Sequence, residues 1–287
     1  MADYEVQGKV ALITGGARGI GFATAQSLRA RGASVVIVDL DLDAAQRAAA
    51  QIDDTHALGL AADVTDRGAM QRAVATTVER FGALDIVMAN AGIASTGATM
   101  RAMSTESFDR VIDVNVKGVA HTVEVALPEI VRSKGHVVVV ASVYAFINGI
   151  TEIPYAMSKA AVEQLGRALR VELVQHGASA SVAYFGFIDT AMVQQGLDQD
   201  PLAQEMIATL PKALRKRLTP AQAGEAVARG IEGRKPRIIL PRRWAAFSAL
   251  RGIVNPLLDA RMERDAATQA VLRKFDQREG EEQPTTV

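Results

Sequence analysis

The sequence predicts an α/β protein: a single doubly wound domain in which helices flank a seven-stranded parallel sheet. Short apolar runs alternate with longer segments of helical periodicity along most of the 287 residues. Such runs are typical of parallel strands that are buried on both faces. The domain is expected to cover residues 1–243, with strands at residues 9–14, 34–38, 57–61, 84–88, 136–141, 179–184 and 237–240.

The composition restricts the class of protein. Lys plus Arg and Asp plus Glu both number 32, and the resulting zero net charge argues against a nucleic-acid-binding protein. Cysteine is absent and the four histidines lack ligand spacing, so we predict no disulfide and no metal site. The chain shows neither a signal-peptide pattern nor an apolar stretch of membrane-spanning length, so we expect a cytoplasmic protein.

A glycine-rich turn follows the first predicted strand directly. It contains Gly15, Gly19 and Gly21, and a helical segment over residues 22–31 comes next. Strand, glycine turn and helix form the setting of a dinucleotide site, because backbone N–H groups and the helix dipole can meet a pyrophosphate there. A tight turn that binds no ligand is the alternative.

Asp39 ends the second predicted strand and indicates which dinucleotide would bind. A carboxylate at this position can accept hydrogen bonds from the adenosine ribose and would repel a 2′-phosphate. No basic residue follows at once, and Arg18 in the glycine turn is the one nearby cation that could support NADP. We therefore predict NAD as the cofactor. The alternative role for Asp39 is to cap the next helix.

Tyr155 and Lys159 begin a helix that is predicted over residues 155–175. Residues four apart lie on one face of a helix, so the ammonium group can lie beside the phenol. A nearby cation lowers the pKa of a phenol, which is about 10 in isolation. A tyrosine of this kind can exchange a proton with an alcohol oxygen. A chance pair on a surface helix is the alternative.

Three further sites carry polar or small residues where a ligand would lie. Ser142 follows the fifth strand, at the sheet edge where ligands bind in open α/β sheets, and its hydroxyl could hold a substrate oxygen. Asn115 falls inside a helix predicted over residues 104–132, and indicates either a local kink that binds a water or side chain, or a solvent-facing residue. Residues 90–92 are small enough to let the backbone approach a cofactor, or form an ordinary turn.

Together these motifs resemble the short-chain dehydrogenase/reductase (SDR) family in order and spacing. The resemblance covers residues 7–241 and implies a Rossmann-type domain with strand order 3-2-1-4-5-6-7, in a homotetramer or homodimer. The residues that carry it are Thr14-Gly15-x3-Gly19-x-Gly21, Asp63-Val64, Asn90-Ala91-Gly92, Asn115, Ser142 and Tyr155-x3-Lys159.

The resemblance also implies roles for individual residues. Tyr155 would be the catalytic acid/base, and Lys159 would lower its pKa and hold the nicotinamide ribose. Ser142 would orient the substrate, and Asn115 would keep a water in a proton relay. The implied cofactor contacts are Gly15, Arg18, Gly19, Ile20, Gly21, Asp39, Asp63, Val64, Asn90, Ala91, Gly92, Tyr155, Lys159, Gly186, Ile188 and Thr190.

The chain departs from the family pattern at Phe185, where a proline usually precedes the glycine. Gly186 and Thr190 remain, so backbone at Ile188 and the Thr190 side chain could still hold the nicotinamide carboxamide. Residues 191–218 resemble the variable substrate lid and are mostly apolar. We expect a bulky apolar substrate, in a pocket lined by Ser142, Ala145, Phe146, Tyr155, Phe185, Phe187, Met192 and Met206.

Residues 244–287 form an extension beyond the usual end of the family. A basic zone over residues 212–243 precedes an apolar segment over residues 244–258. Packing on the chain's own active site or on a neighbouring subunit is preferred to contact with an anionic membrane surface. The last residues, 277–287, are polar and are expected to be disordered.

The predicted function is an NAD(H)-dependent oxidoreductase that interconverts a secondary alcohol and a ketone, with Tyr155 as the acid/base. One alternative is an NADP(H)-dependent ketone or 3-oxoacyl reductase. Another is a nucleotide-binding regulator that uses the same fold without catalysis.

Overall fold

The computed structural model describes residues 3–209 and 212–278. Seven parallel strands form one sheet in the order β3-β2-β1-β4-β5-β6-β7, which confirms the predicted fold class and strand order. The strands are β1 Val10–Thr14, β2 Ser34–Asp39, β3 Ala57–Ala61, β4 Ile86–Ala89, β5 His136–Ser142, β6 Ser179–Phe185 and β7 Arg237–Leu240.

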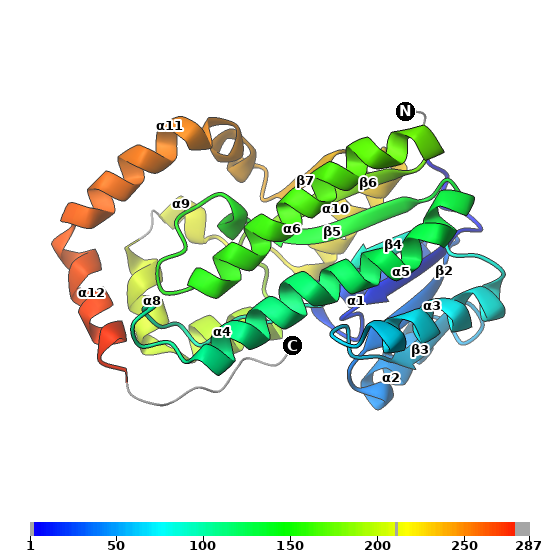
Figure 1. Ribbon diagram of the computed structural model, residues 1–287, viewed down its shortest axis with the longest axis horizontal. Helices are drawn as coiled ribbons and strands as arrows, with labels where there is room; N and C mark the ends of the chain where they lie inside the picture. Colours follow the sequence, from blue (N-terminus) through cyan, green and yellow to red (C-terminus); the bar gives the residue numbers. More distant parts are fainter. Residues whose placement is uncertain (1–2, 210–211, 279–287) are drawn as a thin grey trace.

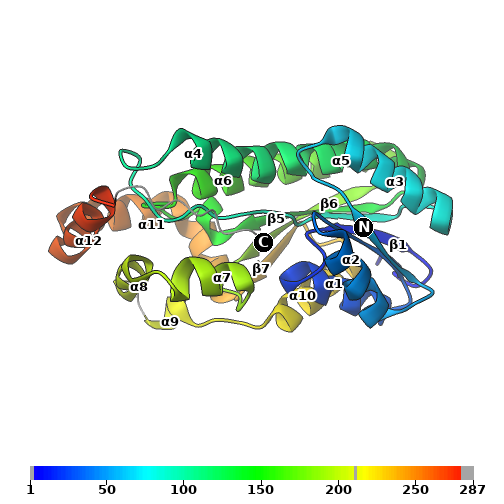
Figure 2. The ribbon, with the colours of Figure 1, turned by 90° about the horizontal axis from the view of Figure 1, so that it is seen from below.

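Helices cover both faces of the sheet, as Figure 2 shows. One face carries α1 Gly19–Arg29, α2 Leu42–Ile52 and α10 Pro220–Glu232, and the other carries α3 Arg67–Phe81, α5 Val119–Arg132 and α6 Ile153–Glu172. Successive strand residues point to opposite faces. In β4, for example, Ile86 joins the core under α1, α2 and α10, whereas Val87 joins the core under α3, α5 and α6.

The helix that the sequence predicts over residues 104–132 is interrupted. It consists of α4 Thr105–Ile112, a π-helical turn over Asp113–Gly118 and then α5. Asn115 lies within the π-helical turn and is fully buried. A wider turn of this kind often marks a functional position, because it redirects side chains and backbone groups. The expected local irregularity at Asn115 is therefore present, and the solvent-facing alternative is wrong.

The segment between β6 and α10, which was expected to form a lid, is mostly helical. It contains α7 Ala191–Val193, a π-helical turn over Gln194–Asp198, α8 Pro201–Ala208 and α9 Lys212–Arg215. An isolated bridge between Ile188 and Leu218 ties the two ends of this segment together.

The C-terminal extension forms two helices, α11 Arg243–Arg264 and α12 Ala266–Asp276. They curve away from the sheet and bring α12 beside α8 (Figure 1). At the start of α11 the ring of Trp244 packs against Phe146 and Phe247, with centroid distances of 6.3 and 5.6 Å. None of the helices in the described part of the chain combines the length and hydrophobicity needed to cross a bilayer.

The end of α12 is held against the body of the protein. Phe275 is 1% exposed, and a Cβ added at Gly97 would lie 3.0 Å from its ring. Arg278 donates to both carboxylate oxygens of Asp200 at 2.9 and 2.7 Å, and to the carbonyl oxygen of Gly97 at 2.8 Å. Arg278 was expected in a disordered tail, but these contacts order it. The rest of that tail, residues 279–287, lies outside the described residues.

Substitution Phe275→Ala should release α12 from the body, because it removes the one large side chain of this helix end that is almost fully buried. The opening free energy of α12 is expected to fall by about 3 kcal/mol, seen as faster amide hydrogen exchange in residues 266–276. Leu257→Ala on α11 is the control, because its side chain is 68% exposed. Equal exchange in the two variants would show that Phe275 does not hold the helix.

Candidate active site

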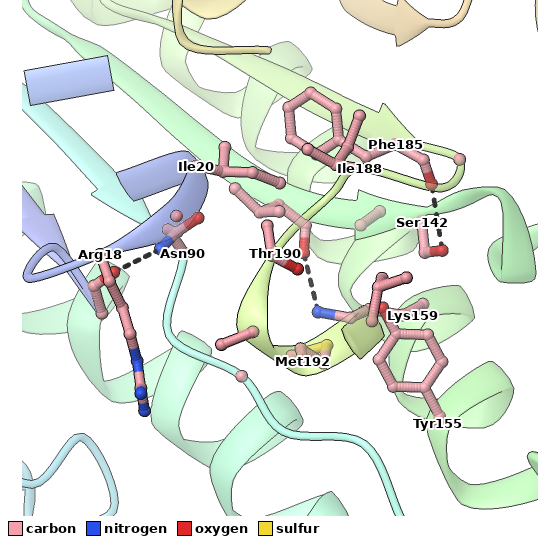
Figure 3. A pocket seen from close by; sticks show the side chains of 18 residues that line it. Arg18, Ile20, Asn90, Ser142, Tyr155, Lys159, Phe185, Ile188, Thr190 and Met192 are labelled. Carbon is pink, nitrogen blue, oxygen red and sulfur yellow. Dashed lines mark hydrogen bonds between the residues drawn. The ribbon is translucent and has the colours of Figure 1, made fainter. Parts of the chain in front are cut away.

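A cavity opens at the carboxyl edge of the sheet, beside the glycine turn (Figure 3). Gly15 and Gly19 both have a φ of +58°, a conformation that favours glycine. A Cβ at Gly21 would lie 2.4 Å from the carbonyl oxygen of Gly15, so no larger residue fits there. The turn therefore brings bare backbone to the cavity, as a phosphate-binding turn must.

Asn90 fixes the glycine turn to the end of β4. Its Nδ2 donates to the carbonyl oxygens of Thr14 and Gly15 at 2.9 and 3.0 Å. In return, Thr14 Oγ1 accepts from the backbone N–H groups of Asn90 and Ala91, each at 3.1 Å. These four bonds hold two neighbouring strand ends at a constant separation, with the cavity beside them.

Asp39 lies at the far side of the glycine turn. Its carboxylate accepts from the backbone N–H groups of Ala17 at 3.1 Å and Leu40 at 2.9 Å. The Asp39 side chain also lines a separate hollow, together with Gly15, Asp63, Val64, Ala91 and Gly92. Asp41 caps α2 by accepting from Ala44 N at 3.1 Å, so the alternative role of Asp39 as that helix cap is wrong.

Tyr155 and Lys159 lie together in the first cavity. Lys159 Nζ is 5.4 Å from the centroid of the Tyr155 ring and donates to the carbonyl oxygen of Val140 at 3.2 Å. The lysine is 4% exposed. This excludes the alternative of a chance pair on a surface helix. Other predicted cofactor contacts line the same cavity: Gly15, Arg18, Gly19, Ile20, Asn90, Gly92, Gly186, Ile188 and Thr190.

Burial controls the protonation of this pair. It raises the pKa of Tyr155 to about 12, although the hydroxyl of Ser142 lowers that pKa and the charge of Glu152 raises it further. Burial also lowers the pKa of Lys159 to about 8. Desolvation is thus the largest influence on the Tyr155 pKa in the chain by itself, and the expected lowering of that pKa by Lys159 stays a prediction.

Ser142 lies between β6 and Tyr155. Its Oγ donates to the carbonyl oxygen of Phe185 at 3.2 Å and accepts from the backbone N–H of Tyr144 at 3.3 Å. A hydroxyl has one proton to give, so it must turn away from Phe185 in order to donate to the phenol oxygen of Tyr155. Ser142 can thus hold an oxygen placed next to Tyr155.

Asn115 contacts the same region from its π-helical turn. Its Nδ2 donates to the carbonyl oxygen of Ile93 at 2.8 Å and to Ser158 Oγ at 3.1 Å, and its Oδ1 accepts from Ile93 N at 2.8 Å. The side chain therefore anchors the segment after β4 to α6. Its part in a proton relay stays a prediction.

A second cavity adjoins the first and shares Ser142 and Tyr155 with it. Most of its apolar lining comes from the lid segment, namely Met192, Val193, Leu197, Ala203, Met206 and Ile207. Phe187, Ala94 and Val143 complete it. Its polar lining includes Ser95, Tyr144, Thr151 and Glu152, none of which the motifs singled out. Only the proximity of the 143–154 loop to Tyr155 in the sequence could have pointed to three of them: Tyr144, Thr151 and Glu152.

Three residues expected in the substrate pocket lie elsewhere. The turn over Val143–Ala145 directs Tyr144 into the second cavity. Ala145 and Phe146 instead line a separate hollow between α6 and α11. The Phe146 ring packs on Tyr184 and Trp244, at 5.7 and 6.3 Å. Phe185 is 4% exposed and lines the first cavity from the core under α1 and α10.

Comparison with known proteins agrees with this geometry. A family model described as short chain dehydrogenase matches residues 9–201. The chain belongs to the short chain dehydrogenase family. Short chain dehydrogenases are oxidoreductases that bind a nicotinamide dinucleotide, so the chain is an oxidoreductase of this family.

Individual relatives in the short chain dehydrogenase family cover most of the chain. The 2-(R)-hydroxypropyl-CoM dehydrogenase of Xanthobacter autotrophicus is 33% identical over 225 residues, 76% of this chain and 89% of that protein. Subunit BbsD of (2S)-[(R)-hydroxy(phenyl)methyl]succinyl-CoA dehydrogenase from Thauera aromatica is 35% identical over 201 residues, 68% of this chain and 79% of that protein. The crystal structure of a short chain dehydrogenase/reductase from Burkholderia phymatum in complex with NAD has a TM-score of 0.75 at 25% identity, and covers 91% of this chain and 97% of that chain.

The pKa of Tyr155 should move in opposite directions in two variants of this short chain dehydrogenase. Ser142→Ala removes the hydroxyl that lowers the pKa, so the pKa rises further. Glu152→Gln removes the charge that raises it, so the pKa falls. A titration of the carbon NMR signal of labelled tyrosine, assigned with Tyr155→Phe, measures both shifts while circular dichroism confirms the fold. Shifts in the same direction would contradict this electrostatic account.

Proposed function

We propose that the protein is an NAD(H)-dependent dehydrogenase that interconverts a secondary alcohol and a ketone, with Tyr155 as the acid/base. The observation that carries the proposal is the position of Tyr155 and Ser142 in the wall common to both cavities. A proton-transfer group must reach both the substrate oxygen and the cofactor region, and this position reaches both.

The residues of the first cavity fit a dinucleotide. The glycine turn offers backbone N–H groups and the N-terminus of α1 to a pyrophosphate. Asp39 borders the neighbouring hollow, where it can accept hydrogen bonds from ribose hydroxyls. The relative of known structure from Burkholderia phymatum was crystallised with NAD, which supports the same cofactor here.

In the proposed reaction Tyr155 exchanges the proton and Ser142 holds the oxygen. For ketone reduction, the raised pKa keeps Tyr155 protonated at neutral pH, so it is ready to donate. For alcohol oxidation, Tyr155 must first give up its proton, and the ammonium of Lys159 beside the ring favours the phenolate. A bound oxidised nicotinamide would supply the hydride acceptor and a further positive charge.

The second cavity supports a largely apolar substrate. Two methionines from the lid, Met192 and Met206, line it together with Phe187. Flexible methionine side chains adapt to irregular apolar ligands. Ser95 and Glu152 form a polar part of the wall, so the cavity is not uniformly apolar.

Tyr155→Phe should abolish most turnover and keep cofactor binding, because it removes the proton and preserves the ring. We expect kcat to fall by about 10²–10⁴-fold, measured by nicotinamide absorbance in a screen of secondary alcohols and ketones. Cofactor affinity, measured by NADH fluorescence, should change little. Tyr4→Phe is the control, because Tyr4 donates to the carbonyl oxygen of Asp85, away from both cavities. Normal turnover in Tyr155→Phe would exclude the proposed mechanism.

Asp39→Asn should weaken discrimination against NADPH, because it removes the charge that repels a 2′-phosphate and keeps an acceptor oxygen. The ratio of NADPH to NADH dissociation constants is expected to fall by about tenfold or more. Asp41→Asn is the matched control, since Asp41 caps α2 outside the hollow and asparagine caps equally well. If the unmodified protein binds NADPH as tightly as NADH, the charge argument at Asp39 fails.

A further inference from the structure

The second cavity contains a carboxyl group that the proposed reaction does not use. Glu152 is half-buried and lies at the start of α6, three residues before Tyr155. It lines the cavity together with the hydroxyl-bearing side chains of Ser95, Thr151 and Tyr144. A carboxyl group in a largely apolar cavity is costly unless a hydrogen-bonding partner binds to it.

Protein groups satisfy this carboxyl only weakly. Among the described residues, its side chain accepts one hydrogen bond, from Ser95 Oγ at a long 3.4 Å. Its other oxygen faces Gly97, where an added Cβ would lie 3.5 Å from Glu152 Oε1. Neither contact is a charge-assisted bond of the usual 2.7–2.9 Å length.

The cation that acts on Glu152 is already engaged elsewhere. Arg278 is close enough to lower the pKa of Glu152, yet its donors go to Asp200 and to the carbonyl oxygen of Gly97. Asp200 adds a second negative charge that raises the pKa of Glu152. Arg278 of the C-terminal extension therefore lies near Glu152 without forming an ion pair with it.

Because burial dominates, the pKa of Glu152 is raised to about 8, and the group is largely a neutral acid at pH 7. A neutral carboxylic acid both donates and accepts a hydrogen bond. Ser95 beside it does the same. A hydroxyl group matches such a pair better than a methyl group, which leaves it unbonded, or an ammonium group, which can only donate.

We propose that Glu152 and Ser95 form a specificity subsite for a second hydroxyl group of the substrate. This rests on the proposed function and makes the substrate a hydroxylated secondary alcohol or hydroxyketone whose remaining surface is apolar. Glu152 and Tyr155 are about one helical turn apart, so the second hydroxyl lies only a few bonds from the reacting carbon.

The test compares secondary alcohols of equal length that carry a hydroxyl, a methyl or an ammonium group at successive positions from the carbinol. The unmodified protein should favour the best hydroxylated member over its methyl counterpart by about tenfold or more in kcat/KM. Glu152→Leu should abolish or reverse that preference. Glu152→Gln, which still donates and accepts, should retain most of it.

Matched measurements separate this subsite from the proposed reaction. Glu172→Leu is the control, because Glu172 is exposed at the other end of α6 and should keep the hydroxyl preference. Calorimetric binding of the same compounds, with NADH present, tests the subsite even if none is turned over. Turnover without a hydroxyl preference, a preference that survives Glu152→Leu, or a stronger preference for ammonium would each overturn the subsite and leave the dehydrogenase function standing. If none of the compounds is turned over but the hydroxylated ones bind selectively, the subsite stands and the dehydrogenase function is overturned.

Discussion

All seven strands run parallel, and this constraint decides where every site residue lies. The segments that follow β1, β2, β4, β5 and β6 open on one edge of the sheet, so residues far apart in the chain meet there. The bonds that join Thr14 and Asn90 hold two of these segments together beneath the nucleotide side. Helix α6 then brings its first two turns to the same edge, and the cavities form around it.

Desolvation is the dominant influence on the chemistry of that edge. It disfavours the charged forms of Tyr155 and Lys159 together, so the chain by itself holds a protonated phenol next to an ammonium group that loses its proton more readily than in water. Within the proposed function, this state suits proton donation to a ketone. The opposite direction depends on positive charge nearby. Glu152 opposes that direction only when it is ionised, above a pH of about 8.

The C-terminal extension connects the lid region to the segment that follows β4. Arg278 links Asp200 of the lid region to the segment that contains Gly97, and Lys274 pairs with Glu205 on α8. The Arg278–Asp200 pair is mostly shielded, whereas exposed pairs such as that of Lys274 contribute little each. The buried ring of Phe275 therefore contributes most of the stability of this contact, and the ion pairs set its position.

The sequence by itself determined the sheet, its strand order by resemblance, and the meeting of the glycine turn, Asn90, Ser142, Tyr155 and Lys159. These features follow from local patterns: apolar runs, glycine positions and a four-residue helical spacing. Only the tertiary structure decided that Phe146 leaves the pocket and that Tyr144 and Glu152 enter it. It also decided the pKa values, because burial depends on segments such as α8 that come from elsewhere in the chain. The direction in which a loop side chain points, and the extent to which a titratable group is shielded from solvent, depend on tertiary packing. No local sequence pattern specifies them.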